Sequence, residues 1–120
     1  MTLKAYIVED NAVIRDNLVE TLGEVLGVET VGHSSTESDA CRWLDQHPKD
    51  WDMLILDLFL AQGTGLGVLQ KCGHHRKNQR VVVLSNYATE EVRKRCLVNG
   101  ADAVFDKSTE IDLFLQYCSH

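Results

Sequence analysis

The sequence predicts an α/β fold in which a doubly wound parallel sheet of five strands carries helices on both faces. Apolar runs too short for a helix alternate with longer helical patterns along the chain. Such alternation is typical of parallel strands joined by crossover helices. No linker rich in proline, glycine or serine interrupts it, and 120 residues suffice for one hydrophobic core. We therefore expect one domain over residues 1–120.

The expected strands are short, and all but the second are strongly apolar, as strands buried on both faces of a sheet must be. The first, third and fourth each end abruptly in a polar side chain. The strands are expected over residues 3–8, 29–33, 53–57, 80–85 and 103–105.

Helices are expected in the gaps between the strands. The first begins after Asp10, and its apolar stripe is expected to contain Val13, Leu18, Leu22 and Val25. The second begins within residues 34–36, each of which has an N-capping hydroxyl, and ends at His47–Pro48. The third spans about residues 65–73.

The last two helices have clear boundary signals. The fourth starts at Thr89 with two acidic residues in its first turn, and it stops at Asn99–Gly100, a good C-terminal cap. The fifth follows Ser108, and its buried face is expected to contain Ile111, Leu113, Phe114 and Leu115.

Polar residues at the strand ends form an ordered set. Glu9 and Asp10 follow the first strand, Asp57 the third, Ser85 the fourth and Lys107 the fifth. One strand ending in Asp or Ser would be ordinary, because turns favour those residues. Open α/β sheets bind ligands at the carboxyl ends of their strands, so we expect the whole set to form one functional site.

This ordered set resembles the receiver domain of two-component response regulators, in particular single-domain, chemotaxis-type regulators. The spacings between its members are similar to those of that family, and the resemblance covers the whole chain. Further matches are Asp57–Leu58, Gly65 and Gly100–Ala101–Asp102. A flavodoxin-like strand order 2-1-3-4-5 would bring Glu9, Asp10 and Asp57 together, with Lys107 about 10 Å away across two strand spacings.

Three converging carboxylates repel one another unless a cation lies among them, and Mg²⁺ suits such a cluster. The resemblance implies that Glu9, Asp10, Asp57 and the backbone carbonyl of Phe59 hold Mg²⁺. It also implies that Asp57 accepts a phosphoryl group from a sensor histidine kinase, a phosphotransfer protein or a small acyl phosphate.

In receiver domains, a lysine and a hydroxyl side chain assist this reaction by contacting the phosphate. The resemblance implies that Lys107 and Ser85 have these roles here. The chain would catalyse its own phosphorylation and dephosphorylation without being a turnover enzyme. Phosphorylation would alter the surface of the fourth helix, fifth strand and fifth helix to control a downstream protein or an attached output domain. The resemblance also allows a homodimer through this surface, which should include Arg93, Lys94, Asp106 and Glu110.

Four positions depart from the family pattern. Val104 stands where an aromatic switch residue is usual, so the readout is expected to differ. Ala61 and Ser108 replace common prolines, and Asn86 replaces a common alanine. None of these changes removes a residue of the expected site.

Composition limits the other functions. A net charge of −6 argues against direct nucleic-acid binding, and the basic run His74–Lys77 is expected to be a solvated loop rather than a binding patch or metal site. No apolar run is long enough to span a membrane and no signal peptide is evident, which predicts a cytoplasmic protein. The scattered cysteines, expected to be small hydrophobes rather than disulfides or zinc ligands, are Cys41, Cys72, Cys96 and Cys118.

Two other functions stay open. The first is a degenerate receiver that acts as a docking module without being phosphorylated. The second is a haloacid-dehalogenase-like phosphohydrolase, which needs an acid two residues after its nucleophile, where this chain has Phe59. The sequence does not distinguish a stand-alone regulator from part of a longer one.

Overall fold

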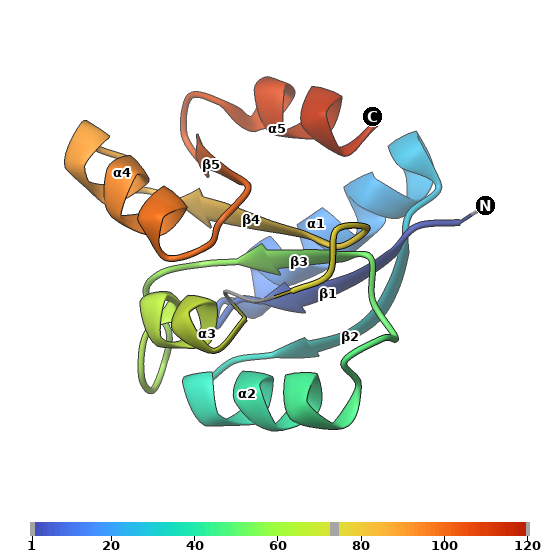
Figure 1. Ribbon diagram of the computed structural model, residues 1–120. Coiled ribbons are helices and arrows are strands. Elements are labelled where there is room, and N and C mark those ends of the chain that lie inside the picture. Colours follow the sequence, from blue (N-terminus) through green and yellow to red (C-terminus); the bar gives the residue numbers. More distant parts are fainter. Residues whose placement is uncertain (1, 73–74, 120) are drawn as a thin grey trace.

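The computed structural model describes residues 2–72 and 75–119 and contains one sheet of five parallel strands. The sheet has the order β2-β1-β3-β4-β5, as expected. Figure 1 shows β3 in the middle of the sheet, with β1 and β4 on either side of it. The strands are β1 (Lys4–Val8), β2 (Glu29–Ser34), β3 (Met53–Leu56), β4 (Arg80–Ser85) and β5 (Ala103–Asp106).

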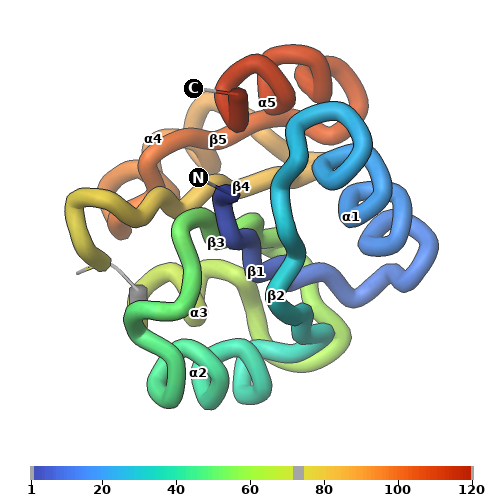
Figure 2. Tube along the Cα trace, turned by 90° about the vertical axis from the view of Figure 1, so that its right-hand side faces the viewer, coloured from blue at the N-terminus to red at the C-terminus, as the bar shows by residue number. Residues whose placement is uncertain are grey.

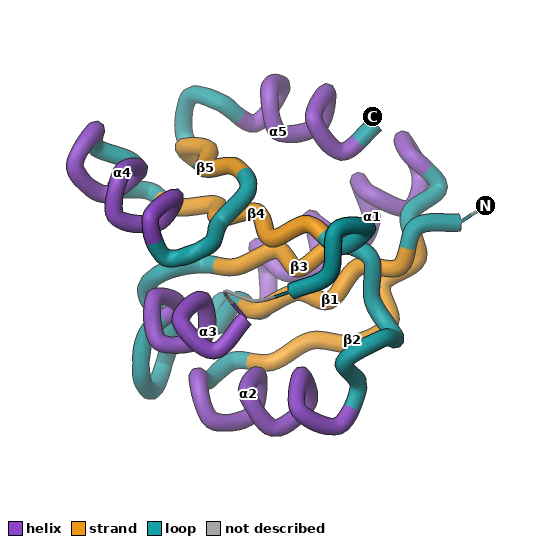
Figure 3. The backbone as a smooth tube through the Cα atoms, in the orientation of Figure 1, coloured by secondary structure: helices purple, strands orange, loops and turns teal. Residues whose placement is uncertain are grey.

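Five helices cover the sheet in two layers. Helices α1 and α5 lie on one face, and α2, α3 and α4 lie on the other (Figures 2 and 3). The helices are α1 (Ala12–Leu26), α2 (Glu37–Gln46), α3 (Gly65–Cys72), α4 (Glu90–Val98) and α5 (Ile111–Cys118). This doubly wound arrangement confirms the fold that the sequence predicts.

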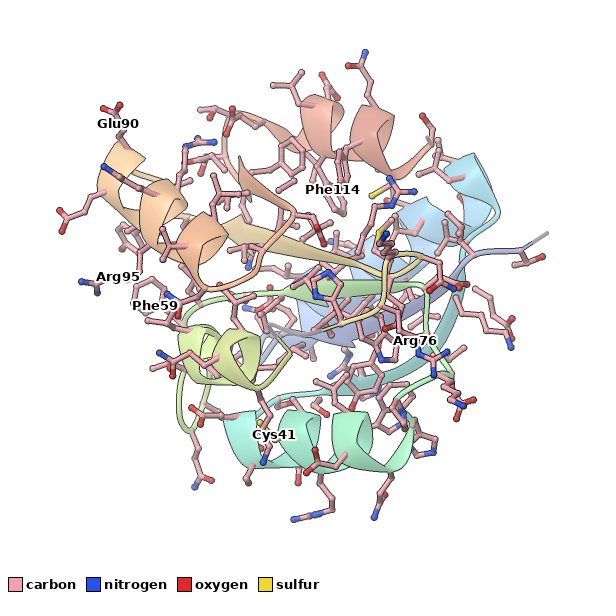
Figure 4. The ribbon with its side chains drawn as sticks, viewed as in Figure 1. Cys41, Phe59, Arg76, Glu90, Arg95 and Phe114 are labelled. Carbon is pink, nitrogen blue, oxygen red and sulfur yellow. The ribbon has the colours of Figure 1, made fainter. Side chains whose placement is uncertain are left out.

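The core has two halves because successive side chains of a strand point to opposite faces. Ile7 and Ile55 pack toward α1 and α5, whereas Val8 and Leu56 pack toward α2, α3 and α4. Figure 4 shows Phe114 directed from α5 toward the sheet, where it is fully buried. The strands are therefore apolar on both faces, and polar chemistry is left to their ends.

Two expected helix faces differ from the structure. Val13 and Val25 are exposed, because the buried stripe of α1 runs through Leu18 and Leu22 with Ile14 beside it. Ile111 and Leu113 are also exposed, because α5 turns Phe114 and Cys118, one turn apart, toward the sheet. The buried stripes of α1 and α5 are therefore narrower than the sequence predicts.

The helix ends follow the expected signals. Thr36 caps α2 and Thr89 caps α4, each accepting a backbone N–H through its hydroxyl oxygen at 3.2 Å. Asn99 is the C-cap of α4 and is followed by Gly100 at φ 110°. Ser34, an alternative cap in the sequence, instead ends β2.

The cysteines and the basic run behave in different ways. Cys41, Cys96 and Cys118 are free thiols, and burial raises the pKa of Cys118 to about 12. Arg76 and Lys77 are exposed, as expected for a loop, but His75 is nearly buried and contacts Asp102 at 2.8 Å. His74 and the side chain of Cys72 lie outside the described residues. Within the described chain, no helix is both long and apolar enough to cross a membrane.

Candidate functional site

Three acidic side chains meet at the carboxyl ends of β1 and β3, which are neighbours in the sheet. Oxygen atoms of Glu9, Asp10 and Asp57 lie within 4.8 Å of one another. Glu9 is 2% exposed and Asp57 is 8% exposed, whereas Asp10 is open to solvent. The strand order thus brings together the three carboxylates that the sequence singles out.

Backbone hydrogen bonds hold Glu9 and Asp57 just beyond the ends of β1 and β3. The amide of Glu9 donates to the Ser34 carbonyl at 3.0 Å, and the amide of Asp57 donates to the Val8 carbonyl at 3.0 Å. Asn11 then caps α1 by accepting the amide of Ile14 at 3.0 Å. Asn11 is not among the residues expected from the sequence to shape the site, although an N-capping residue directly before a helix is a recognisable signal.

Lys107 reaches the acidic cluster from β5, two strands away from β3. Its backbone amide donates to the Ser85 carbonyl at 3.0 Å, which fixes the start of the following loop. Its Nζ atom donates to Asp57 Oδ2 at 3.1 Å and also to Glu9 Oε1. A lysine side chain therefore spans the gap that the sequence analysis expected it to span.

Lys107 brings one positive charge to a cluster of three carboxylates and contacts two of them, Glu9 and Asp57. This imbalance of charge sets the electrostatics of the site. Burial raises the pKa of Glu9; the hydrogen bond from Lys107 opposes this only in part, and the charge of Asp57 adds to it. Burial alone would lower the pKa of Lys107, but the two carboxylates outweigh it and hold that pKa above its usual value. Lys107 therefore stays protonated at neutral pH. The carboxylates still exceed it in charge, so a further cation at this site would be stabilised.

Ser85 and two aromatic residues complete the surroundings. Ser85 is fully buried at the end of β4, and its hydroxyl oxygen accepts the amide of Tyr87 at 3.2 Å. The rings of Phe59 and Tyr87 pack edge to face, with centroids 5.4 Å apart, and are 59% and 64% exposed. Both rings line the cleft of about 240 Å³ that contains the carboxylates. Figure 4 shows Phe59 at the carboxyl end of the sheet, opposite Arg76.

Ala61 and Ser108, which stand where the family commonly has proline, each donate a backbone hydrogen bond that proline could not make. The amide of Ala61 donates to the Ser35 carbonyl at 3.3 Å, and the amide of Ser108 donates to Asp106 Oδ1 at 2.7 Å. Each bond tethers a loop beside the site. The absence of proline at these positions therefore has a structural reason.

Arg93 joins three segments on the α4, β5 and α5 side. Its guanidinium donates to the carbonyls of Ala88 at 2.8 Å and Val104 at 3.2 Å, and it pairs with Glu110. Glu110 Oε1 also accepts the amide of Asp106 at 2.9 Å. Arg93 and Glu110, both expected on the responsive surface, are therefore bound to each other.

The family model for the response regulator receiver domain matches residues 5–118. The chain belongs to this family. It is 26% identical over 100 residues to the DNA-binding transcriptional activator DevR/DosR of Mycobacterium tuberculosis, covering 82% of this chain and 45% of that protein. It is 24% identical over 109 residues to the response regulator VraR of Staphylococcus saprophyticus, covering 91% of this chain and 51% of that one. The chain spans about half the length of these curated relatives.

Solved receiver structures have the same fold. The response regulator domain of Thermotoga maritima CheB superimposes with a TM-score of 0.84 at 17% identity, covering 98% of this chain and 93% of that one. A chain of the CheX–CheY–BeF3–Mg²⁺ complex from Borrelia burgdorferi gives a TM-score of 0.83 at 22% identity, covering 97% of this chain and 86% of that one. The resemblance based on the strand-end residues is thus confirmed, and the chain is a response regulator receiver domain of the two-component type.

The excess of negative charge predicts an effect on stability. In EDTA at pH 7, Glu9→Gln is expected to raise the free energy of unfolding, because it removes a buried carboxylate whose charged form is disfavoured. The pKa of Glu9 is higher in the folded than in the unfolded chain. The advantage of the variant should therefore shrink as the pH falls through the folded value, and disappear once Glu9 is protonated in both states.

Urea denaturation of wild type and Glu9→Gln at several pH values measures this difference. Mg²⁺ at about 100 times its dissociation constant should add about 2.7 kcal/mol to the wild type and less to the variant. Lower stability of Glu9→Gln in EDTA at pH 7 would contradict this charge balance.

Proposed function

We propose that the chain is a phospho-acceptor switch in which Asp57 takes a phosphoryl group from a sensor histidine kinase, a phosphotransfer protein or a small acyl phosphate. The observation that carries this proposal is the contact between the nearly buried Asp57 carboxylate and the Lys107 ammonium, 3.1 Å apart, at the edge where the other acidic residues meet. Membership of the receiver family supports it. The cytoplasm, where such kinases present their phosphohistidine, is the proposed location.

The residues fit a bound Mg²⁺ ion. Glu9, Asp10 and Asp57 offer hard oxygen ligands within one small cluster, and their charge exceeds that of Lys107. Phe59 belongs to the same corner, since its amide approaches Asp57 Oδ1 at 3.4 Å, and we assign its backbone carbonyl as a further ligand. When bound, Mg²⁺ would neutralise charge on the phosphoryl oxygens.

In the proposed reaction, a carboxylate oxygen of Asp57 attacks the phosphorus in line. The new O–P bond forms as the bond from phosphorus to the donor nitrogen or oxygen breaks, and the electron pair leaves with the donor. The Lys107 ammonium, protonated and already beside Asp57, stabilises the charge on the transferred group. The Ser85 hydroxyl, whose oxygen accepts a bond from Tyr87, keeps its own proton to donate to the phosphate.

The same geometry suggests how the signal leaves the site. A phosphate on Asp57 that accepts a hydrogen bond from the Ser85 hydroxyl would shift the loop that begins at Asn86. Arg93 connects that loop, through Ala88, to the backbone of Val104 and to Glu110. Val104 is a small, nearly buried side chain that stands where an aromatic switch residue is usual. We therefore propose that Arg93, rather than residue 104, transmits the shift to β5 and α5.

The target is proposed to be a downstream protein, a second copy of the chain bound through the α4, β5 and α5 surface, or an attached output domain. Curated relatives include a DNA-binding activator. A net charge of −6 argues against direct nucleic-acid binding by this domain.

Incubation with a small acyl phosphate and Mg²⁺ tests the proposal. We expect one phosphate on Asp57, labile to alkali and hydroxylamine, and no uptake by Asp57→Asn. Intact-protein mass spectrometry with and without EDTA measures this uptake. A wild-type protein that takes up no phosphate would support the docking-module alternative, whereas steady phosphate release from a monoester would support the phosphohydrolase.

The aromatic pair predicts a long-lived signal. Loss of phosphate needs a water molecule in line behind the phosphorus. The exposed rings of Phe59 and Tyr87 pack against each other and line the cleft that contains the carboxylates, where this water would enter. Phe59→Asn should open the path and offer the water a hydrogen bond. We expect dephosphorylation to become about tenfold faster, a change of about 1.4 kcal/mol in the barrier.

The decay of phosphorylated wild type and Phe59→Asn is compared at one Mg²⁺ concentration. Tyr87→Phe is the matched control, because it keeps the ring that packs against Phe59 and removes only the hydroxyl. Equal or slower decay of Phe59→Asn would mean that water access is controlled elsewhere.

A further inference from the structure

We infer that Glu37, at the start of α2, is a positioning residue for the loop that follows Asp57, and that it tunes Mg²⁺ affinity without contacting the metal. This inference rests on the proposed function, because it concerns the metal site of the phospho-acceptor. Glu37 belongs to neither the acidic cluster nor the output surface described above. Its effect would come through the position of the Phe59 peptide.

The carboxylate of Glu37 is bound to the loop from another element. Glu37 Oε1 accepts the backbone amide of Thr64 at 2.8 Å, directly before α3. Helix α3 has no acidic residue in its own first turn. A negative charge near a helix N-terminus is stabilising, so Glu37 supplies from α2 what α3 lacks.

Two glycines make the space for this carboxylate. A Cβ atom on Gly67 would overlap the carboxylate of Glu37, and one on Gly63 would overlap its Cβ atom. Gly63 also has a φ of 76°, which side chains rarely adopt. The half-buried glutamate thus lies directly against the loop and the first turn of α3.

Backbone bonds extend this anchor along the loop. The amide of Glu37 donates to the Gln62 carbonyl at 3.0 Å, and Ala61 donates to Ser35 at 3.3 Å. Residues Thr36 and Gln62 pair as in a parallel sheet. The far side of the loop is therefore tied to the segment between β2 and α2.

The anchored end of the loop reaches the metal corner within a few residues. Thr64 pairs with Phe59 in an antiparallel bridge, and the amide of Gly65 donates to the Leu58 carbonyl at 2.9 Å. A Cβ atom on Gly65 would overlap the backbone carbonyl oxygen of Asp57, so only glycine lets the chain pass this close to the Asp57 backbone. A shift of Thr64 would therefore move the Phe59 peptide.

Mg²⁺ titration calorimetry tests the inference on the intact chain. Glu37→Ala should raise the Mg²⁺ dissociation constant about tenfold, which corresponds to about 1.4 kcal/mol. Glu37→Gln keeps an oxygen that can accept the Thr64 amide, so it should restore most of the affinity. The matched control is Asp39→Ala, which removes an acidic residue from the same turn of α2, where Asp39 pairs with Arg42 instead.

A second variant produces the same displacement without changing Glu37. Gly67→Ala should expel the carboxylate and weaken Mg²⁺ binding, although alanine favours a helix more than glycine does. In the Glu37→Ala background the space is empty, so adding Gly67→Ala should cause no further loss. Independent, additive losses would overturn the shared mechanism.

Two further measurements separate positioning from a general loss of structure. In metal-free protein, hydrogen exchange of the Thr64 amide should accelerate in Glu37→Ala and stay unchanged in Asp39→Ala. At saturating Mg²⁺, the phosphorylation rate of Glu37→Ala should stay within about twofold of the wild type, because Asp57 and Lys107 are untouched.

The outcomes distinguish this inference from the proposed function. A wild-type chain that binds no Mg²⁺ would overturn both. A wild type that binds Mg²⁺ and is matched by Glu37→Ala would overturn the inference alone. Equal loss in Glu37→Gln and Glu37→Ala would assign the effect to distant charge rather than to loop position.

Discussion

The contact of the Lys107 ammonium with Glu9 and Asp57 is the interaction on which the rest of this site depends. It exists because the sheet places β1 and β3 side by side and leaves β5 within reach of one long side chain. The charge balance is also incomplete, since Lys107 brings one positive charge to a cluster of three carboxylates. The folded chain therefore holds an anionic pocket whose excess negative charge a divalent cation would balance.

Much of this arrangement could be predicted from the sequence, because the decisive residues lie directly at strand ends. Once the strand order is assumed, it places Asp57 and Lys107 at the same edge of the sheet. The errors have a local cause: Val13 and Leu113 are apolar but lie beside the buried stripes of their helices. Periodicity alone does not fix the width of a stripe, because the neighbouring layer decides which apolar side chains it covers.

Other features could not be predicted, because they depend on contacts between residues far apart in the chain. The Glu37 carboxylate lies in a space left by Gly67, and neither residue type is unusual on its own. Likewise, Arg93 binds the backbone of Val104, so the position that lacks the usual aromatic side chain is held through its carbonyl oxygen. In both cases a charged side chain from a neighbouring element holds a backbone group near the site.

The most direct test of this account is to compare Mg²⁺ binding with phosphate uptake in the wild type and Lys107→Ala. The Lys107 ammonium contacts carboxylates that would also bind the metal, and it would contact the transferred phosphate directly. Its removal should therefore affect Mg²⁺ binding and phosphate uptake differently. The account predicts equal or tighter Mg²⁺ binding in Lys107→Ala, together with impaired phosphorylation by an acyl phosphate or an impaired activated state. A large loss of Mg²⁺ binding in this variant would contradict it.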